Sequence, residues 1–218
     1  MPDFSHDVDA GDPGCQTRSW FTDADGDGHG AGAAISSCTQ PVNTVASADD
    51  CDDQSFARHP GAAETCDALD TDCNATTDGC PSQCVAVRRP PPDDQRLYLF
   101  CANPLSWVDA ATQCDTIGAT LLRINSASEN SFVRTTSTAM FGALPIHIGA
   151  NDRIAEATWL WPDGTSFYIE GVPIVGYINW AASEPNDDGG AEDCGVMLAD
   201  GTWNDDVCAE LKPSVCRK

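Results

Sequence analysis

The sequence predicts an α+β protein in two parts, of which the first is small, irregular and rich in cysteine. Residues 1–83 carry 16 acidic and 2 basic side chains, whereas residues 84–218 carry 18 and 9. Large apolar side chains are scarce before residue 84, and five of the six tryptophans follow it. The second part can therefore build an ordinary hydrophobic core, while the first part needs another source of stability.

The composition of the whole chain narrows the class of protein. Its 218 residues include 34 acidic and 11 basic side chains, which give a formal net charge of -23. This charge repels phosphate backbones and excludes nucleic acid as a partner. Twelve cysteines favour disulfides and therefore a secreted or cell-surface protein. No apolar run reaches the roughly 20 residues of a membrane span, so we expect no membrane insertion.

The N-terminal residues do not show the export signal that the cysteine content leads us to expect. Residues 1–10 contain neither a basic start nor an apolar stretch, so no export signal is visible. We expect residues 1–14 to form a flexible segment. We also expect the chain to be a fragment or a mature form, or to have a misplaced start.

Residues 15–80 form the predicted acidic module, which we expect disulfides and metal ions to stabilise. Its densest signal is the run Asp23–Gly30, which has carboxylates at positions 1, 3 and 5 of a calcium loop and glycine at position 6. Carboxylates with this spacing can curl around one hard cation, and the glycine permits a sharp turn. The predicted ligands are Asp23, Asp25 and Asp27. Position 12 lacks the usual glutamate, so Asp49, Asp50, Asp52 or Asp53 is expected to complete the site.

A second run repeats this spacing at Asp70, Asp72 and Asn74. The simpler interpretation of both runs is that they are solvated acidic turns, because Asp, Gly and Asn favour turns without a ligand. The pairing of the module's six cysteines stays open at this point. These cysteines are Cys15, Cys38, Cys51, Cys66, Cys73 and Cys80.

The module resembles a family of bacterial extracellular metal-binding repeats. The shared elements are D-x-D-G-D-G, D-C-D-D, P-G-A-x-E-x-C and C-D-x-x-D-x-D-C, which match residues 23–30, 50–53, 60–66 and 66–74. Some relatives of these repeats are associated with copper, for which His6, His29 and His59 are the candidate ligands. The oxygen-rich side chains of the module suit calcium better.

The second part begins with three regular elements. Residues 97–101 form a short apolar run that predicts a strand. Residues 106–114 predict a helix, because Ser106 can cap it and Asp109 occupies the third helical position. A second helix is predicted at 128–137, with its N-terminal signal at residues 126–129 and core contacts at Phe132 and Val133.

Short strands and loops follow. The stretch 151–193 has little periodicity and is much longer than an ordinary connection, so we expect it to be functional. Trp159, Trp161 and Trp180 are expected to pack in the core, and His147 to be a strand histidine with satisfied hydrogen bonds. Asp200 and Gly201 predict a hairpin turn. The predicted strands are 146–150, 158–161, 195–198, 202–203 and 214–216.

Residues 84–218 resemble the C-type lectin-like domain. The motifs that carry the resemblance are the W-x-x-A-x-x-x-C helix, Glu-Pro-Asn at 184–186, Glu-Asp-Cys at 192–194, Trp-Asn-Asp at 203–205 and the closing Val-Cys. The resemblance implies two helices, small antiparallel sheets and a long calcium-binding loop. It also implies the disulfides Cys114–Cys216, Cys194–Cys208 and, in the extra N-terminal hairpin of the long form, Cys84–Cys101.

The resemblance further implies one or two calcium ions in this domain, in addition to any in the acidic module. Calcium takes six to eight oxygen ligands, so a principal site can keep positions open for two vicinal hydroxyls of a sugar. Glu-Pro-Asn implies equatorial hydroxyls, as in mannose, glucose, N-acetylglucosamine and fucose. The principal site, which also binds the carbohydrate, is implied at Glu184, Asn186, Glu192, Asn204 and Asp205. The auxiliary site is implied at Asp152, Glu156, Asp187 and Asp193, with Glu192 shared.

The sequence therefore predicts a calcium-dependent carbohydrate-binding protein that is secreted by a bacterium or displayed on its surface. Its expected partners are glycans or glycoconjugates. We expect no enzymatic activity, because the acidic residues near the site are all assigned to calcium and no nucleophilic triad stands out. The alternative is a protein-binding or structural adhesion module that uses calcium only to order its loop. The sequence does not predict the oligomeric state.

Overall fold

The computed structural model of the chain describes residues 15–77, 79–93 and 95–218. The predicted flexible segment 1–14 and His6 lie outside the described residues. The chain divides into two compact units, Met1–Gly79 and Cys80–Lys218, which we describe separately. All twelve cysteines are disulfide-bonded. In the described part of the chain, no helix has the length and apolarity to cross a membrane.

The N-terminal unit contains a small antiparallel sheet that the sequence did not predict. Its strands are β1 (Arg18–Thr22), β2 (Ala31–Ser37) and β3 (Thr44–Val45), in the order β2-β1-β3. The strands are short and mostly exposed, so they show no clear apolar alternation. Disulfides Cys15–Cys38 and Cys51–Cys73 cross-link the unit and compensate for its small core.

The C-terminal unit contains the two predicted helices. Helix α1 (Trp107–Thr116) begins after Ser106, whose Oγ accepts the Asp109 backbone N–H at 3.2 Å. Helix α2 (Ala127–Phe141) begins after Ser126, whose Oγ accepts the Glu129 backbone N–H at 3.2 Å. Both N-caps lie where capping chemistry predicts them. Helix α2 is longer than predicted and ends before Gly142.

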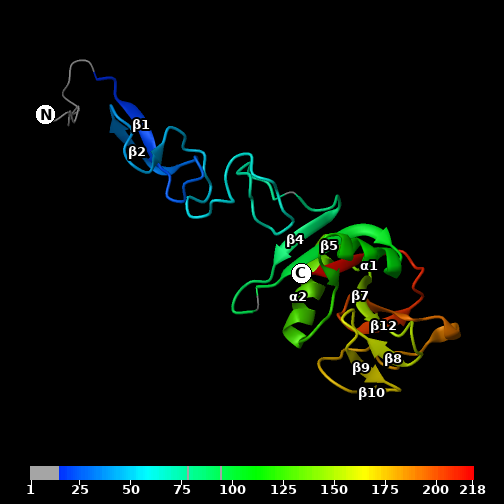
Figure 1. The fold of residues 1–218 in the computed structure, drawn as a ribbon. Helices are drawn as coiled ribbons and strands as arrows, with labels where there is room; N and C mark the ends of the chain where they lie inside the picture. Colours follow the sequence, from blue (N-terminus) through cyan, green and yellow to red (C-terminus); the bar gives the residue numbers. More distant parts are fainter. Residues whose placement is uncertain (1–14, 78, 94) are drawn as a thin grey trace. The chain divides into compact units, whose positions relative to one another are not determined.

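One mixed sheet runs through the C-terminal unit (Figure 1). Its main path is β10-β9-β8-β7-β13-β5-β4, and β11 connects β12 to β7 while β6 pairs with β13. Only the pairing of β13 with β7 is parallel among the described strands. The strands are β4 (Cys84–Arg88), β5 (Leu97–Leu105), β6 (Thr120–Leu121), β7 (Ile146–Asn151), β8 (Thr158–Leu160), β9 (Ser166–Ile169), β10 (Val172–Pro173), β11 (Cys194–Met197), β12 (Trp203–Asp206) and β13 (Lys212–Arg217).

The core of this unit is formed by residues of α2, the sheet and the long loop and is rich in aromatic side chains. Trp159 and Trp161 are buried, as predicted, and Trp180 packs edge-on against Trp159 with ring centroids 4.7 Å apart. Trp203 is fully buried in the same cluster. These rings hold the long loop against the sheet by burying large apolar surfaces.

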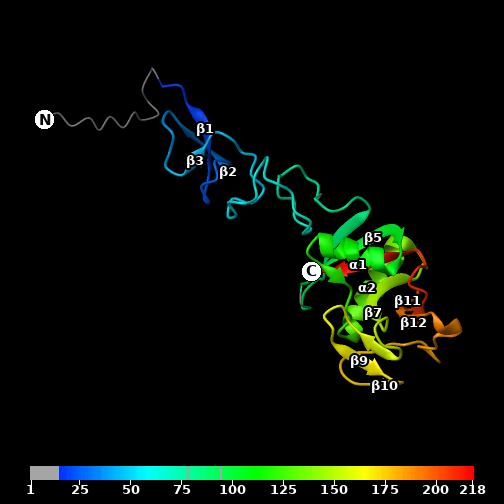
Figure 2. The same cartoon turned by 45° about the vertical axis from the view of Figure 1, so that its right-hand side comes forward.

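The long stretch after β7 is more regular than its sequence suggested. It contains β8, β9 and β10, followed by a 3-10 turn at Asp188–Gly190. Its two ends meet, because Asn151 pairs with Cys194 and the Asp152 N–H donates to the Asp193 carbonyl at 3.1 Å. In the second view the orange part of this stretch lies beside β11 and β12 (Figure 2).

Three disulfides cross-link the C-terminal unit. Cys84–Cys101 joins β4 to β5, and Cys114–Cys216 joins α1 to β13. Cys194–Cys208 joins the start of β11 to the chain that follows β12. The last bond closes the hairpin that follows the long loop, so it stabilises the strands next to that loop.

His147 on β7 is fully buried. Its Nε2 lies 3.1 Å from the Leu105 carbonyl and 3.0 Å from the Glu210 carbonyl, so Nε2 must carry the hydrogen. Its Nδ1 has no hydrogen-bond partner among the described residues, so the expectation of a fully satisfied histidine was only half right. Burial lowers the pKa of His147, and the nearby Lys212 lowers it further.

We expect His147 to make the fold sensitive to mild acid. Its pKa is lower in the folded state than the unfolded value of about 6.5, so its contribution is fully present above that pH and is lost as the pH falls through the folded pKa. We would measure the melting temperatures of wild type and of His147→Phe in the presence of a calcium chelator. Between pH 7.5 and pH 5, the melting temperature should therefore fall more for wild type than for His147→Phe. Equal falls in the two proteins would show that His147 does not control this sensitivity.

Candidate calcium and ligand site

The long loop is joined to β12 by one buried carboxylate. Asp205 is 1% exposed, and its Oδ2 accepts the backbone N–H groups of Asn186 at 2.9 Å and Asp187 at 2.7 Å. Charge-assisted hydrogen bonds of this kind are stronger than neutral ones. Two stretches that are far apart in sequence therefore meet at Asp205.

The loop also folds back on itself around Glu192. The Asp188 N–H donates to Glu192 Oε2 at 2.9 Å, and the Glu192 N–H donates to Asp187 Oδ1 at 3.2 Å. On β12, the Asn204 side-chain amide donates to the Asp205 carbonyl. All five residues predicted for the principal site thus belong to the loop or to the strand that it contacts.

The carboxylates of this region repel one another. Burial raises the pKa of Glu184, and the charges of Asp205 and Glu192 raise it further. Burial also raises the pKa of Glu192, with an added contribution from Asp205. A group whose ionised form is disfavoured in this way is stabilised by a nearby cation. The site is therefore electrostatically suited to a positive ion.

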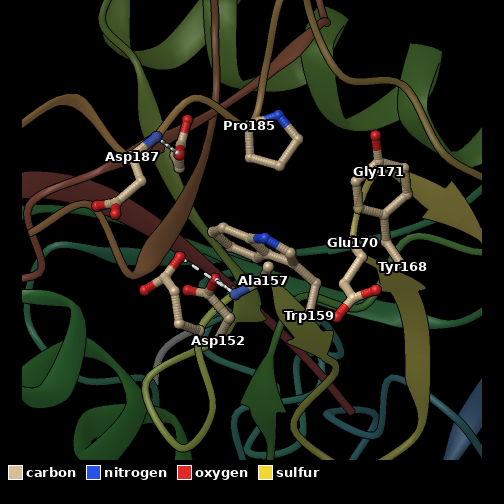
Figure 3. A pocket seen from close by; sticks show the side chains of 10 residues that line it. Asp152, Ala157, Trp159, Tyr168, Glu170, Gly171, Pro185 and Asp187 are labelled. Atoms are coloured by element: carbon tan, nitrogen blue, oxygen red, sulfur yellow. Dashed lines mark hydrogen bonds between the residues drawn. The ribbon is translucent and has the colours of Figure 1, made fainter. Parts of the chain in front are cut away.

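A small cavity of about 130 Å³ lies beside this region (Figure 3). The Trp159 ring lies beneath Pro185, with Asp152 on one side and Tyr168 on the other. Asp152 is 2% exposed, its Oδ2 accepts the Ala157 N–H at 2.9 Å, and burial raises its pKa to about 7. The cavity is lined by Asp152, Glu156, Ala157, Trp159, Tyr168, Glu170, Gly171, Pro185, Asp187 and Asp205.

This cavity brings together most of the side chains predicted for the auxiliary site. Asp152, Glu156 and Asp187 line it, whereas Asp193 and the shared Glu192 do not. Asp193 contributes only the carbonyl that accepts the Asp152 N–H. Sequence reasoning did not predict Tyr168 and Glu170 in this wall, because they come from the unrecognised β9–β10 hairpin. No local signal in the sequence marks them as neighbours of Asp152.

The residues present fit a hard dication. Among the described residues of the C-terminal unit, three carboxylate oxygens are buried without a hydrogen-bond partner: Asp152 Oδ1, Glu184 Oε2 and Asp205 Oδ1. Leaving such oxygens unpaired is costly, and calcium prefers oxygens of this kind. In the described C-terminal unit, no three Asp, Glu, His or Cys ligand atoms gather within 4.8 Å of one another. Two of the five predicted principal ligands are asparagines, whose side-chain carbonyl oxygens can also bind calcium.

In the N-terminal unit, Asp23, Asp25 and Asp27 do gather, with ligand atoms within 4.8 Å of one another. The segment expected to complete this loop lies against it, because Asp53 Oδ1 accepts the Ala24 N–H at 2.9 Å. Asp49 instead pairs with His29 at 3.0 Å, which raises the pKa of the imidazole. The arrangement agrees with the spacing argument for this loop.

Asp70 and Asp72 form a second group with Glu64, again within 4.8 Å. Sequence reasoning did not select Glu64 as a ligand, although it lies in the P-G-A-x-E-x-C element. Its Oε1 accepts the Asp72 N–H at 2.7 Å. A third group contains Cys51 and Cys73, but these cysteines share a disulfide and have no thiolate to offer a metal.

The chain belongs to the C-type lectin domain family. The family profile described as "Lectin C-type domain" matches residues 103–218. The profile described as "Putative metal-binding motif" matches residues 50–79, so the resemblances seen in the two parts of the sequence are confirmed. C-type lectin domains are non-enzymatic binding domains that typically hold calcium, and this homology suggests carbohydrate binding.

Among curated proteins, the rat asialoglycoprotein receptor 2 is 34% identical over 126 residues, which are 56% of this chain and 38% of the receptor. The human C-type lectin domain family 10 member A is 33% identical over 159 residues, or 70% of this chain and 45% of the relative. The chain thus spans less than half of the length of these relatives. The disulfides and the lectin domain are consistent with an extracellular protein.

Two solved structures illustrate the similarity of the fold. The carbohydrate-recognition domain of cow CD23, solved in the presence of a GlcNAc2Man3 oligosaccharide, has a TM-score of 0.50 and 28% identity and covers 64% of this chain and 95% of that one. The lectin CEL-I from Cucumaria echinata has a TM-score of 0.52 and 24% identity, and covers 64% and 97%. The second similarity concerns the fold alone.

Proposed function

We propose that the C-terminal unit binds carbohydrate through calcium at the principal site and prefers sugars with equatorial vicinal hydroxyls, such as mannose, glucose, N-acetylglucosamine and fucose. One observation carries the proposal: buried Asp205 joins the Glu-Pro-Asn loop to β12 while its second oxygen stays unpaired among the described residues. Calcium held there would supply coordination positions to two sugar hydroxyls.

The side chains around that ion would orient the sugar. The amide groups of Asn186 and Asn204 can donate hydrogen bonds to hydroxyl oxygens, and the carboxylates of Glu184 and Glu192 can accept hydroxyl hydrogens. We propose a second calcium at the auxiliary residues, which would neutralise the carboxylates of the cavity and order the loop. We also propose metal binding at Asp23, Asp25 and Asp27 in the acidic module.

A glycan array with and without chelator tests this function. Binding of mannose-type glycans should depend on calcium and should be competed by free mannose. Calcium at about 100 times its Kd should stabilise the fold by about 2.7 kcal/mol, which calorimetry measures as a higher melting temperature. A single shallow site binds weakly, so the array should present many copies of each glycan.

The same experiment distinguishes carbohydrate binding from the alternative function. A protein whose melting temperature rises with calcium but which no sugar elutes or stabilises would be a calcium-ordered protein-binding or adhesion module. Secretion or display at a bacterial surface fits either outcome, and we propose that location because the N-terminal unit resembles bacterial extracellular repeats.

A further inference from the structure

Two asparagine side chains connect helix α2 and the long loop to the turn before β12. Asn130 on α2 is 6% exposed; its Nδ2 donates to the Gly201 carbonyl at 2.9 Å, and its Oδ1 accepts the Trp203 indole N–H at 2.9 Å. Asn179 in the long loop donates from Nδ2 to the same Gly201 carbonyl at 2.7 Å. We call Asn130, Asn179, Gly201 and Trp203 the asparagine clamp.

The clamp lies where the two halves of the principal site come together. The Trp203 N–H donates to the Asn179 carbonyl at 2.8 Å, and the Ala181 N–H donates to the Trp203 carbonyl at 2.8 Å. Directly after Trp203 come Asn204 and Asp205, and shortly after Ala181 comes Glu184. These hydrogen bonds therefore determine the register between the strand and the loop that carry the ligands.

The turn in the clamp has little room to move. Gly201 has a φ of 92°, and a Cβ there would lie 2.7 Å from Arg134 Cδ and 3.2 Å from Asn130 Nδ2. The backbone of the turn therefore packs closely against α2. A side-chain amide is suited to position 130, because it can donate to a carbonyl and accept from an indole N–H at the same time.

We propose that Asn130 and Asn179 are positioning residues for the principal calcium site: they hold Trp203 and the turn so that Asn204 and Asp205 face the Glu184 loop. This inference rests on the proposed function, because it assumes that calcium binds there. Buried hydrogen bonds of this kind specify one arrangement, since any other arrangement leaves polar groups unpaired.

The test compares Asn130→Leu with Val133→Ala, a core substitution on the same helix at a fully buried residue. Calorimetry would give the melting temperature of each calcium-free protein, and titration well below that temperature would give its calcium affinity. Asn130→Leu should bind calcium about tenfold more weakly than wild type, because two buried hydrogen bonds are lost. Val133→Ala should lower the melting temperature but leave calcium affinity unchanged.

Two further measurements complete the test. Hydrogen exchange of the Trp203 indole N–H, followed by NMR, should be faster in Asn130→Leu than in Val133→Ala. Asn179→Leu, at a half-buried position, should also weaken calcium binding and provides the same test if Asn130→Leu does not fold. Equal calcium affinities in the asparagine variants and in Val133→Ala would overturn the clamp. Wild-type protein that binds no calcium would overturn the proposed function itself, and the clamp with it.

Discussion

The substitution Asp205→Asn should remove calcium binding at the principal site while the calcium-free protein stays folded. An asparagine side-chain oxygen can still accept the two loop N–H groups that Asp205 holds. The substitution does remove one negative charge from a buried position next to the expected ion. Calcium affinity should fall by about 100-fold or more, as measured by isothermal titration.

The calcium-free melting temperature provides a second readout. Because the charge of Asp205 raises the pKa of Glu184, removing that charge relieves repulsion, and the apo protein should melt at the same temperature as wild type or higher. Asp188→Asn is the matched control, because Asp188 is an exposed acid in the same loop and is not a predicted ligand. If both variants lose calcium equally, the general charge of the loop, and not ligation by Asp205, controls the affinity.

The double change Glu184→Gln with Asn186→Asp should redirect sugar preference from mannose towards galactose. The exchange keeps the total charge but swaps the positions of the hydrogen-bond donor and the charged acceptor. A sugar whose hydroxyls have a different arrangement should therefore fit the two groups better. A monosaccharide competition assay on an immobilised glycan measures the preference.

Calcium titration is the control for this exchange. The double variant should keep its calcium affinity within about tenfold, because the number of carboxylates is unchanged. A variant that binds calcium and still prefers mannose would show that groups other than Glu184 and Asn186 discriminate between the sugars. The cavity wall around Tyr168 and Glu170 would then be the first place to examine.

The parts of the fold that could be predicted are those specified by neighbouring residues. Ser106 and Ser126 mark the helix starts because N-capping is a local interaction, and Gly201 forms the predicted turn, where its N–H donates to the Leu198 carbonyl at 2.9 Å. The β9–β10 hairpin escaped prediction because β9 is only four residues long and β10 only two. Such short strands depend on tertiary packing, here on the buried Phe167.

The candidate site could likewise be predicted only in part from the sequence. Its expected ligands were visible as short motifs, because the family resemblance associates those motifs with calcium. The contacts that arrange them were not visible. The Asn130–Trp203 bond spans 73 residues, and the Asn186–Asp205 bond spans 19. Hydrogen bonds between such distant partners leave no periodic pattern, so only the folded chain reveals them.

The long stretch between β7 and β11 leaves the sheet and returns to it at neighbouring points, because Asn151 pairs with Cys194 and the Asp152 N–H donates to the Asp193 carbonyl. Surface segments anchored at closely spaced ends tolerate changes in length and composition, because closing them costs little additional entropy. An engineered version of this stretch can therefore vary its exposed residues, but it must keep Trp159 and Trp161, whose rings belong to the core of the unit.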